Sequence, residues 1–231
     1  MEEIYTTIQK ICSKYPRPAR FSDPGGDFSD EELSNLIEKN DADLIEEDLM
    51  CIFQGALPAG EYHEVMYFLP IALEHVAGNQ ENDTLDNLLR WISYNQNALQ
   101  ADNCYDDLLI FFELLFVQWT SFFDLKGDSP VNCSVVLTLI EELNEPAFNL
   151  YGDTLLQKNL GEAATYEKAA WLIYLLESHL WGWKKISPYL SRVAADKNLL
   201  KKAYDLIVSE VMEDEKLLLF WDRIFNRVGI Y

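Results

Sequence analysis

The amino-acid sequence predicts an all-α protein. Every long apolar segment of the 231 residues repeats with a period near 3.6, and no run of alternating Val, Ile, Thr or Tyr between turn residues indicates a strand. Six Trp, twelve Tyr and twelve Phe supply a large core and exclude a disordered acidic chain. We therefore expect about ten helices in antiparallel pairs, forming a short α-solenoid or an irregular helical bundle.

The N-terminal elements follow from apolar spacing and from capping residues. Isoleucines spaced by three or four residues predict a helix over residues 2–14, which the Pro-Arg-Pro sequence at 16–18 ends. Ser29 and Glu32 have the spacing of a capping box, which predicts that a short helix begins there.

The next two helices are predicted over the acidic part of the chain. Asp41 or Asp43 is expected to cap a helix whose apolar residues face inward and whose acids face outward, and Pro-Ala-Gly at 58–60 ends it. Residues 61–77 also have a helical pattern, but Pro70 lies within them. Because proline lacks a backbone donor, we expect a kink or a helix start there.

The centre of the chain predicts two longer helices. Asp83 or Thr84 is expected to cap a helix over residues 85–99, and a second helix covers residues 105–123. The second is apolar on most faces and is expected to be central. The later helices are predicted over residues 133–143, 147–157, 166–181, 198–212 and 213–228, with a further start at Pro188.

Turn residues and charge predict two subdomains. Gly-Asp-Ser-Pro at 127–130 marks a break, so we expect an acidic N-terminal helical subdomain at 1–126 and a second helical subdomain at 131–231, packed as one globular unit. Residues 21–90 contain 17 acids against 2 bases, which is −15 of the net charge of −21. Such a charge disfavours nucleic-acid and membrane partners and steers the protein toward a basic one.

The sequence also predicts a compartment and a redox state. The N-terminus lacks the basic and apolar regions of a signal peptide, and the longest apolar run, residues 108–119, is too short to span a bilayer. We therefore expect a cytoplasmic protein without a membrane span. The four cysteines have neither zinc-site spacing nor the density of a disulfide scaffold, which favours reduced, partly buried thiols: Cys12, Cys51, Cys104 and Cys133.

Motifs for catalysis, cofactors and metals are absent from the sequence. It contains no HExxH, GxSxG, Walker or GxGxxG pattern. His63-Glu64 and Glu74-His75 lie about three helical turns apart, which is too far for one metal ion unless the chain folds back at Pro70. We predict no catalytic, cofactor or metal residues and no cofactor.

Aromatic residues near the C-terminus allow two interpretations. Trp171, Tyr174 and Trp181, followed by Trp183 and Lys184-Lys185, have the composition of a base-stacking surface beside a basic groove. However, Trp171, Tyr174 and Trp181 recur at three and seven residues, which is typical of core packing, and the net charge repels nucleic acid. The sequence favours the core.

Several segments resemble an uncharacterised bacterial family of about this length. They are Lys14-Tyr-Pro-Arg-Pro18, Leu44 to Leu49, Met66-Tyr-Phe-Leu-Pro70 with Ala72-Leu73-Glu74, and Leu89-Arg-Trp91 leading into residues 106–119. Together they cover the first half of the chain. The resemblance implies an all-α bacterial protein. The family has no assigned activity that the resemblance could bring. Family members carry clustered cysteines after the Tyr-Pro-Arg-Pro element, whereas this chain has Phe21 to Phe28 there, so the resemblance implies no metal role.

The acidic surface gives the leading functional hypothesis. We expect a non-enzymatic, cytoplasmic binding protein whose acidic helices cover a basic partner, most concretely an immunity-type inhibitor of a basic, nuclease-like toxin domain. Tyr62 or Phe28 is expected to serve as an exposed anchor. The alternatives are an α-helical scaffold that holds a peptide or helix, and an enzyme with an unrecognised all-α site. The predicted partner-binding residues are Asp41, Asp43, Glu46, Glu47, Asp48, Glu61, Tyr62 and Glu64.

Overall fold

The protein is all-α, as the sequence predicts. The structure, a computed structural model, is 71% helical and describes residues 2–11, 15–54, 58–78, 82–182 and 186–230. Cys12, the end of the predicted first helix and the Trp183-Lys184-Lys185 segment lie outside the described residues. The chain forms two compact units, Met1–Leu115 and Phe116–Tyr231. Their boundary falls within a helix, rather than at the predicted break near Gly127.

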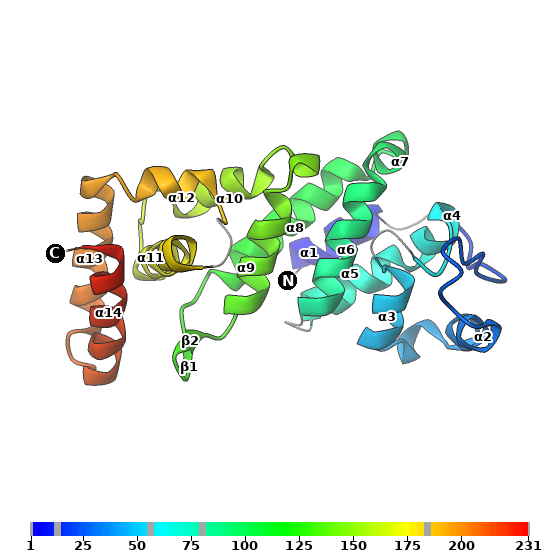
Figure 1. Cartoon of the computed structure of the whole chain (residues 1–231), viewed down its shortest axis with the longest axis horizontal. Coiled ribbons are helices and arrows are strands. Elements are labelled where there is room, and N and C mark those ends of the chain that lie inside the picture. Colours follow the sequence, from blue (N-terminus) through cyan, green and yellow to red (C-terminus); the bar gives the residue numbers. More distant parts are fainter. Residues whose placement is uncertain (1, 12–14, 55–57, 79–81, 183–185, 231) are drawn as a thin grey trace. The chain divides into compact units, whose positions relative to one another are not determined.

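The N-terminal unit consists of short helices (Figure 1). Among them α1 packs against α5, α3 against α6, and α5 against α6. The elements are α1 (Glu2–Ile11), α2 (Asp30–Glu38), η1 (Asp41–Asp43), α3 (Glu46–Ile52), α4 (Tyr62–Val65), η2 (Met66–Phe68), α5 (Leu69–Gly78), α6 (Asn82–Tyr94), α7 (Gln96–Ala101) and the first part of α8 (Tyr105–Trp119).

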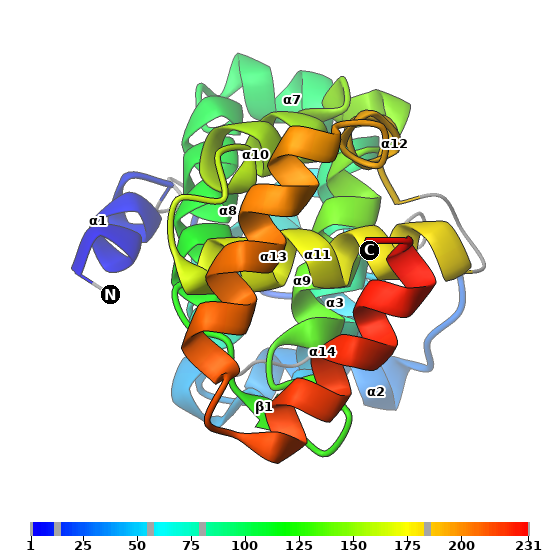
Figure 2. The same cartoon turned by 90° about the vertical axis from the view of Figure 1, so that its left-hand side faces the viewer.

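The C-terminal unit is organised around α11. This helix packs against α10, α12, α13 and α14, and Figure 2 shows the antiparallel pair α13 and α14 lying across it. Eight consecutive residues of α11, from Ala169 to Leu176, are buried. This arrangement is an irregular bundle rather than a stack of equal helix pairs. The elements are β1 (Leu125–Lys126), β2 (Ser129–Pro130), α9 (Cys133–Leu143), η3 (Pro146–Phe148), α10 (Tyr151–Leu160), α11 (Tyr166–Trp181), α12 (Pro188–Val193), α13 (Lys197–Val211) and α14 (Glu215–Val228).

Several predicted helix boundaries are confirmed. The helices at Cys133–Leu143 and Tyr166–Trp181 have the predicted limits. The capping box of Ser29 is present, because its hydroxyl accepts the N–H of Glu32 and the Glu32 carboxylate accepts the N–H of Ser29. Pro70 lies in the first turn of α5, where its missing N–H breaks no helical hydrogen bond.

Other boundaries differ for local reasons. The predicted helix over residues 85–99 is split into α6 and α7 at Asn95, whose side chain donates to the carbonyl of Trp91 (2.9 Å). Such a contact competes with the regular backbone ladder and favours a break. Asp41 and Asp43 do not cap α3: they form η1, and Ile45 precedes the helix. The turn at residues 127–128 closes a two-stranded hairpin.

The helices of the described residues are too short or too polar to cross a bilayer.

In the cores of both units the largest buried side chains are aromatic, including Trp91 in the first and Trp171 and Trp221 in the second. Helix α8, predicted to be central, buries Phe111 and Phe112 but exposes about half of the Ile110 side chain, at 48%. The helix buried on most faces is α11 instead.

Candidate functional site

The acidic part of the N-terminal unit contains a groove between α2 and α3. Its volume is about 580 Å³. Leu36 is buried in its floor, with Phe28 and Cys51 half-buried beside it. Five carboxylates and a single ammonium group line it, so its net charge is −4; the charged residues are Glu32, Glu38, Lys39, Asp43, Glu47 and Asp48. The groove therefore combines an apolar floor with an acidic rim.

Asp48 has a structural role, which corrects the prediction that it faces a partner. Its side chain is buried, both carboxylate oxygens contact the Lys39 Nζ (2.6 and 2.7 Å), and it accepts the N–H of Ile45 (3.0 Å). This N–H belongs to the residue that precedes α3. The carboxylate therefore holds the start of α3 against the end of α2, and it uses the one cation of the groove.

The remaining charges of the groove are more accessible. Glu38 and Glu47 are exposed, and within the described part of the chain neither pairs with a cation. Asp43 is exposed and accepts the Asn40 amide (2.9 Å). The hydroxyl and N–H of Ser29 donate to Glu32 and lower the pKa of its carboxyl, which stays ionised in mild acid. These four carboxylates leave an uncompensated negative field in the groove.

Asp41 is predicted to bind a partner, but its carboxylate is already in contact with two side chains. It forms an ion pair with Arg17 and accepts the Tyr67 hydroxyl (2.6 Å). Arg17 also donates to the carbonyls of Ile37 and Lys39, and its guanidinium lies over the Tyr67 ring at 5.7 Å. Asp41 and the Tyr-Pro-Arg-Pro segment therefore fix the end of α2.

Tyr62 is not an exposed anchor, contrary to the prediction. Its ring is half-buried and stacks on Trp91, with centroids 5.8 Å apart, and its hydroxyl donates to Asp102 (2.8 Å). Burial and this carboxylate raise the pKa of Tyr62 far above its usual value. Tyr15 donates to the same Asp102 oxygen (3.0 Å). Of the two predicted anchors, only Phe28 lies at the groove.

Glu61 and Glu64 lie at the start of α4 and not in the groove. Glu61 is exposed, whereas Glu64 accepts the hydroxyl of Ser22 (2.7 Å) and the N–H of Glu61 (2.9 Å). Burial acts to raise the pKa of Glu64, but these hydrogen bonds outweigh it and lower the pKa. Glu46 is half-buried and also does not line the groove. The predicted face is thus divided, and only Asp43, Glu47 and Asp48 of the predicted set line the groove.

The chemistry of the groove does not favour covalent catalysis. Burial and the nearby Asp48 and Glu32 carboxylates raise the pKa of Cys51, so its thiol stays protonated and weakly nucleophilic. Of the three other cysteines, Cys104 and Cys133 form no disulfide in the described structure, and Cys104 is buried.

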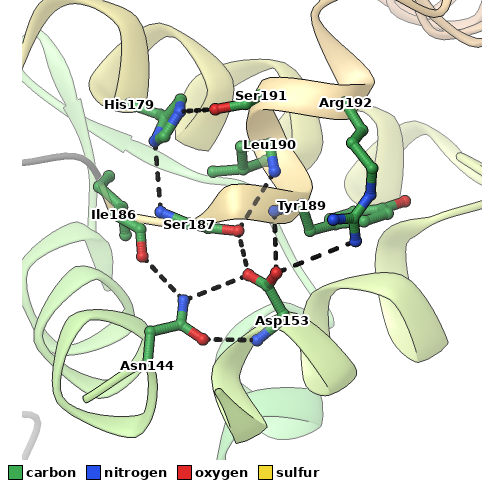
Figure 3. A network of polar contacts seen from close by, with 9 residues as sticks. All are labelled: Asn144, Asp153, His179, Ile186, Ser187, Tyr189, Leu190, Ser191 and Arg192. Carbon is green, nitrogen blue, oxygen red and sulfur yellow. Dashed lines mark hydrogen bonds and ion pairs between the residues drawn. The ribbon is translucent and has the colours of Figure 1, made fainter. Parts of the chain in front are cut away.

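A second polar cluster, missed at the level of sequence, lies in the C-terminal unit (Figure 3). Asp153 of α10 accepts the Ser187 hydroxyl and the N–H of Tyr189 (2.9 Å), and lies 3.9 Å from Arg192. Asn144 joins the cluster by accepting the Asp153 N–H (2.8 Å) and donating to the Ile186 carbonyl (2.8 Å). In the sequence, Ser187 before Pro188 indicates a helix start. No sequence pattern indicates the cluster itself, because its residues lie far apart along the chain.

His179 of α11 completes this cluster and brings serine, histidine and aspartate together. Its Nδ1 accepts the N–H of Ser187 (3.3 Å), and its Nε2 lies 2.8 Å from the Ser191 hydroxyl. Because Nδ1 accepts, the proton of the neutral ring is on Nε2, which donates to Ser191. A histidine that donates to a serine cannot take its proton. The cluster therefore lacks the geometry of a Ser-His nucleophile.

The aromatic residues of α11 divide between core and surface. Trp171 and Tyr174 are buried, as the core interpretation predicts. Trp181 is 67% exposed, so that interpretation is wrong for this residue. Its indole N–H donates to the Arg227 carbonyl of α14 (2.9 Å), which holds the ring against that helix end.

The histidines show no metal geometry in the part of the chain that the structure describes. No three His, Cys, Asp or Glu side chains of the described ranges lie close enough together to hold a metal ion. His63 is exposed, with its Nδ1 3.9 Å from Glu61.

The comparisons with known proteins gave no relative: no protein-family model matches the chain, and neither does a curated protein or a solved structure. The likeness of the Tyr-Pro-Arg-Pro and Tyr-Phe-Leu-Pro segments to a bacterial family therefore remains a resemblance.

Proposed function

We propose that the chain is a non-enzymatic binding protein whose α2–α3 groove receives a basic segment of a partner protein. The observation that carries this proposal is the lining of the groove. Among the residues that the structure describes, four of its five carboxylates have no cation beside them, and the one ammonium group in the lining is held by Asp48. Phe28 and Leu36 give the same groove an apolar surface.

This lining suits both parts of a lysine or arginine side chain, the aliphatic stem and the charged end. The aliphatic stem packs on Phe28 and Leu36, while the charged end lies among Glu38, Asp43 and Glu47. An arginine also gains from the face of the Phe28 ring. The surrounding excess of negative charge raises the association rate with a basic protein, to about 10⁸ M⁻¹s⁻¹ or more at low salt.

An immunity-type inhibitor is the most concrete form of this proposal. A nuclease-like toxin binds phosphates through a basic surface, and an acidic groove with a similar charge density competes for that surface. Rapid association driven by opposite charge suits such an inhibitor, because it has to act before the toxin does. The proposed mechanism is occlusion, with no chemical step.

The experiment compares two variants with the same change in charge. The groove variant is Glu38→Gln, Asp43→Asn and Glu47→Gln, and the control is Glu2→Gln, Glu3→Gln and Glu74→Gln, which are exposed and lie outside the groove. Each removes three negative charges from the total of −21. Binding of a deca-arginine peptide is measured by calorimetry, and capture from the lysate of the native host is measured alongside.

We expect the control to bind like wild type and the groove variant to bind about tenfold more weakly at low salt. The difference between them should shrink as added salt screens the charges. Equal binding by both variants would contradict the groove as the site. If the groove variant captures the same proteins as wild type at low and at high salt, the result would favour the scaffold hypothesis instead.

A further inference from the structure

The short helix α12 depends on the polar cluster of Figure 3 for its N-terminal hydrogen bonds. Its six residues are too few to be stable as an isolated helix. The N–H of Ser187 donates to His179, that of Tyr189 to Asp153 (2.9 Å), and that of Leu190 to the Ser187 hydroxyl (3.2 Å). Pro188 has no N–H to satisfy. Every donor of the first turn is therefore used within the cluster.

One of these contacts depends on the protonation state of His179. The ring is buried, at 2% exposed, and its Nδ1 accepts from a backbone N–H of Ser187, which is itself fully buried. Protonation would turn Nδ1 into a donor that faces another donor. The contact would then be lost, and the buried Ser187 N–H would have no acceptor.

We propose that His179 makes α12 a pH-sensitive latch. While the ring is neutral, it holds the first turn of α12 against α10 and α11. When the ring takes up a proton, the Ser187 N–H is released and α12 separates from the two helices. Leu190 and Tyr189, now buried, become accessible in the open state. The inference concerns the C-terminal unit and does not depend on the proposed acidic groove.

Among the described residues, the helices packed around α11 bring the following titratable groups toward this contact. From α10, Asp153 accepts the Ser187 hydroxyl, and from α12 Arg192 lies 3.9 Å from Asp153 and over the Tyr189 ring. In general a nearby carboxylate favours the charged form of a histidine and a nearby guanidinium opposes it.

The other packed helices contribute mainly apolar residues. The buried face of α13 is Leu200, Ala203, Ile207 and Val211, and that of α14 is Phe220, Trp221, Ile224 and Phe225. On α9 the buried residues are apolar, Cys133 in its first turn contacts Tyr174, and its Glu141 lines the same hollow as Glu177 and Ile186. Glu177 of α11 is paired with Arg227 of α14 (2.7 Å). Among the ordinary side-chain pKa values, that of histidine lies between about pH 5.5 and about pH 7.5, whereas those of Asp, Glu, Cys, Tyr and Arg lie outside this range.

The first test is made on the wild-type chain and needs no mutation. Long-range proton–nitrogen NMR spectra distinguish which ring nitrogen of a histidine carries the proton. We expect His179 to be in the Nε2–H form at about pH 7.5. Finding the proton on Nδ1, or a charged ring at this pH, would overturn the proposal, because Nδ1 could not then accept from Ser187.

The second test measures opening of α12 by amide hydrogen exchange, corrected for intrinsic exchange rates, at about pH 7.5 and about pH 5.5. Asp and Glu stay largely ionised over this range, so the histidines account for the change. Uptake of one proton allows at most a tenfold change in opening per pH unit, and we expect the amides of Ser187, Tyr189 and Leu190 to open about tenfold more at the lower pH. The amides in the centre of α13 serve as an internal reference.

Two variants separate the latch from a general effect of acid. In His179→Asn, the side-chain oxygen can take the place of Nδ1 but cannot be protonated, so opening of α12 should lose its pH dependence. His63→Gln removes an exposed histidine and should leave that dependence unchanged. The proposal is wrong if wild-type α12 opens equally at both pH values, or if His179→Asn keeps the full pH response.

Discussion

Replacing Asp48 tests whether this acid holds α3 in place or serves a partner. The structure gives the carboxylate two separable contacts: the Lys39 ammonium at 2.6 and 2.7 Å, and the N–H of Ile45 at 3.0 Å. Asp48→Asn keeps an oxygen that can accept the N–H but removes the charge. Asp48→Ala removes both. Asp48→Asn therefore measures the ion pair, and the difference between the two variants measures the contact at the start of the helix.

The expected loss of unfolding free energy is about 1 kcal/mol for Asp48→Asn and about 2 kcal/mol for Asp48→Ala. The share assigned to the ion pair, about 1 kcal/mol, lies well below the cost of breaking a buried pair, because the Lys39 side chain is 36% exposed and recovers water when its partner is removed. Loss of a side-chain acceptor at a helix N-terminus costs about 1 kcal/mol more. Glu47→Gln, on the same helix and exposed, is the matched control with the same change in charge.

The assay is urea unfolding followed by far-UV circular dichroism, at low and at high salt. Glu47→Gln should unfold like wild type or slightly later, since it relieves repulsion in an acidic chain. High salt should reduce the loss in Asp48→Asn more than the additional loss in Asp48→Ala, because only the ion pair is screened. If both Asp48 variants unfold like Glu47→Gln, the structural role assigned to Asp48 is wrong.

Two further predictions concern a titrating acid and a strained residue. Because the pKa of Glu64 lies below its unfolded value, its contribution is present above about pH 4.3 and is lost as pH falls through the folded pKa. Glu64→Gln should therefore lose less stability than wild type between about pH 5 and about pH 3, and an equal loss in acid unfolding curves would contradict this. Leu150 is 43% exposed and has a positive φ of 58°. Leu150→Asn should raise the unfolding free energy by up to about 1 kcal/mol, measured by urea unfolding, and a decrease would show that the Leu150 side chain contributes more than the strain costs.

The fold class and many helix limits could be predicted because they depend on local patterns. Apolar spacing located α9 and α11 with the observed limits, and the Ser29 capping box is a contact within one turn. The errors arose where a side chain competes with the backbone, as at Asn95, which divides α6 from α7. Asn87, Gln96 and Asn97 lie in the same segment, so an amide side chain by itself gave no sequence signal that distinguished a break from a continuous helix.

The candidate site was predicted less well because acidity alone does not show which carboxylates are used by the fold. Lys39 is nine residues from Asp48, and only the folded chain shows that they meet. Tyr62 contacts Asp102, which is 40 residues away. The cluster around His179 likewise joins α10, α11 and the start of α12. Contacts between separate helices decide these roles, and periodicity carries no information about them.

The fold uses many of its acids to satisfy backbone N–H groups, and this limits which acids can meet a partner. Asp23, Glu32, Asp48 and Glu64 each accept at least one N–H in the acidic part of the chain. Hydrogen bonds hold the pKa of Glu32 and Glu64 low, so these carboxylates keep their charge in mild acid. One oxygen of each already accepts hydrogen bonds from within the chain, so these acids contribute mainly to the long-range field. Association with a basic partner would therefore depend on the whole acidic surface, whereas dissociation would depend on the few accessible acids of the groove, chiefly Glu38 and Glu47. It follows that neutralising a few acids outside the groove should slow association only slightly and leave the lifetime of the complex unchanged, whereas the groove variant should also shorten that lifetime.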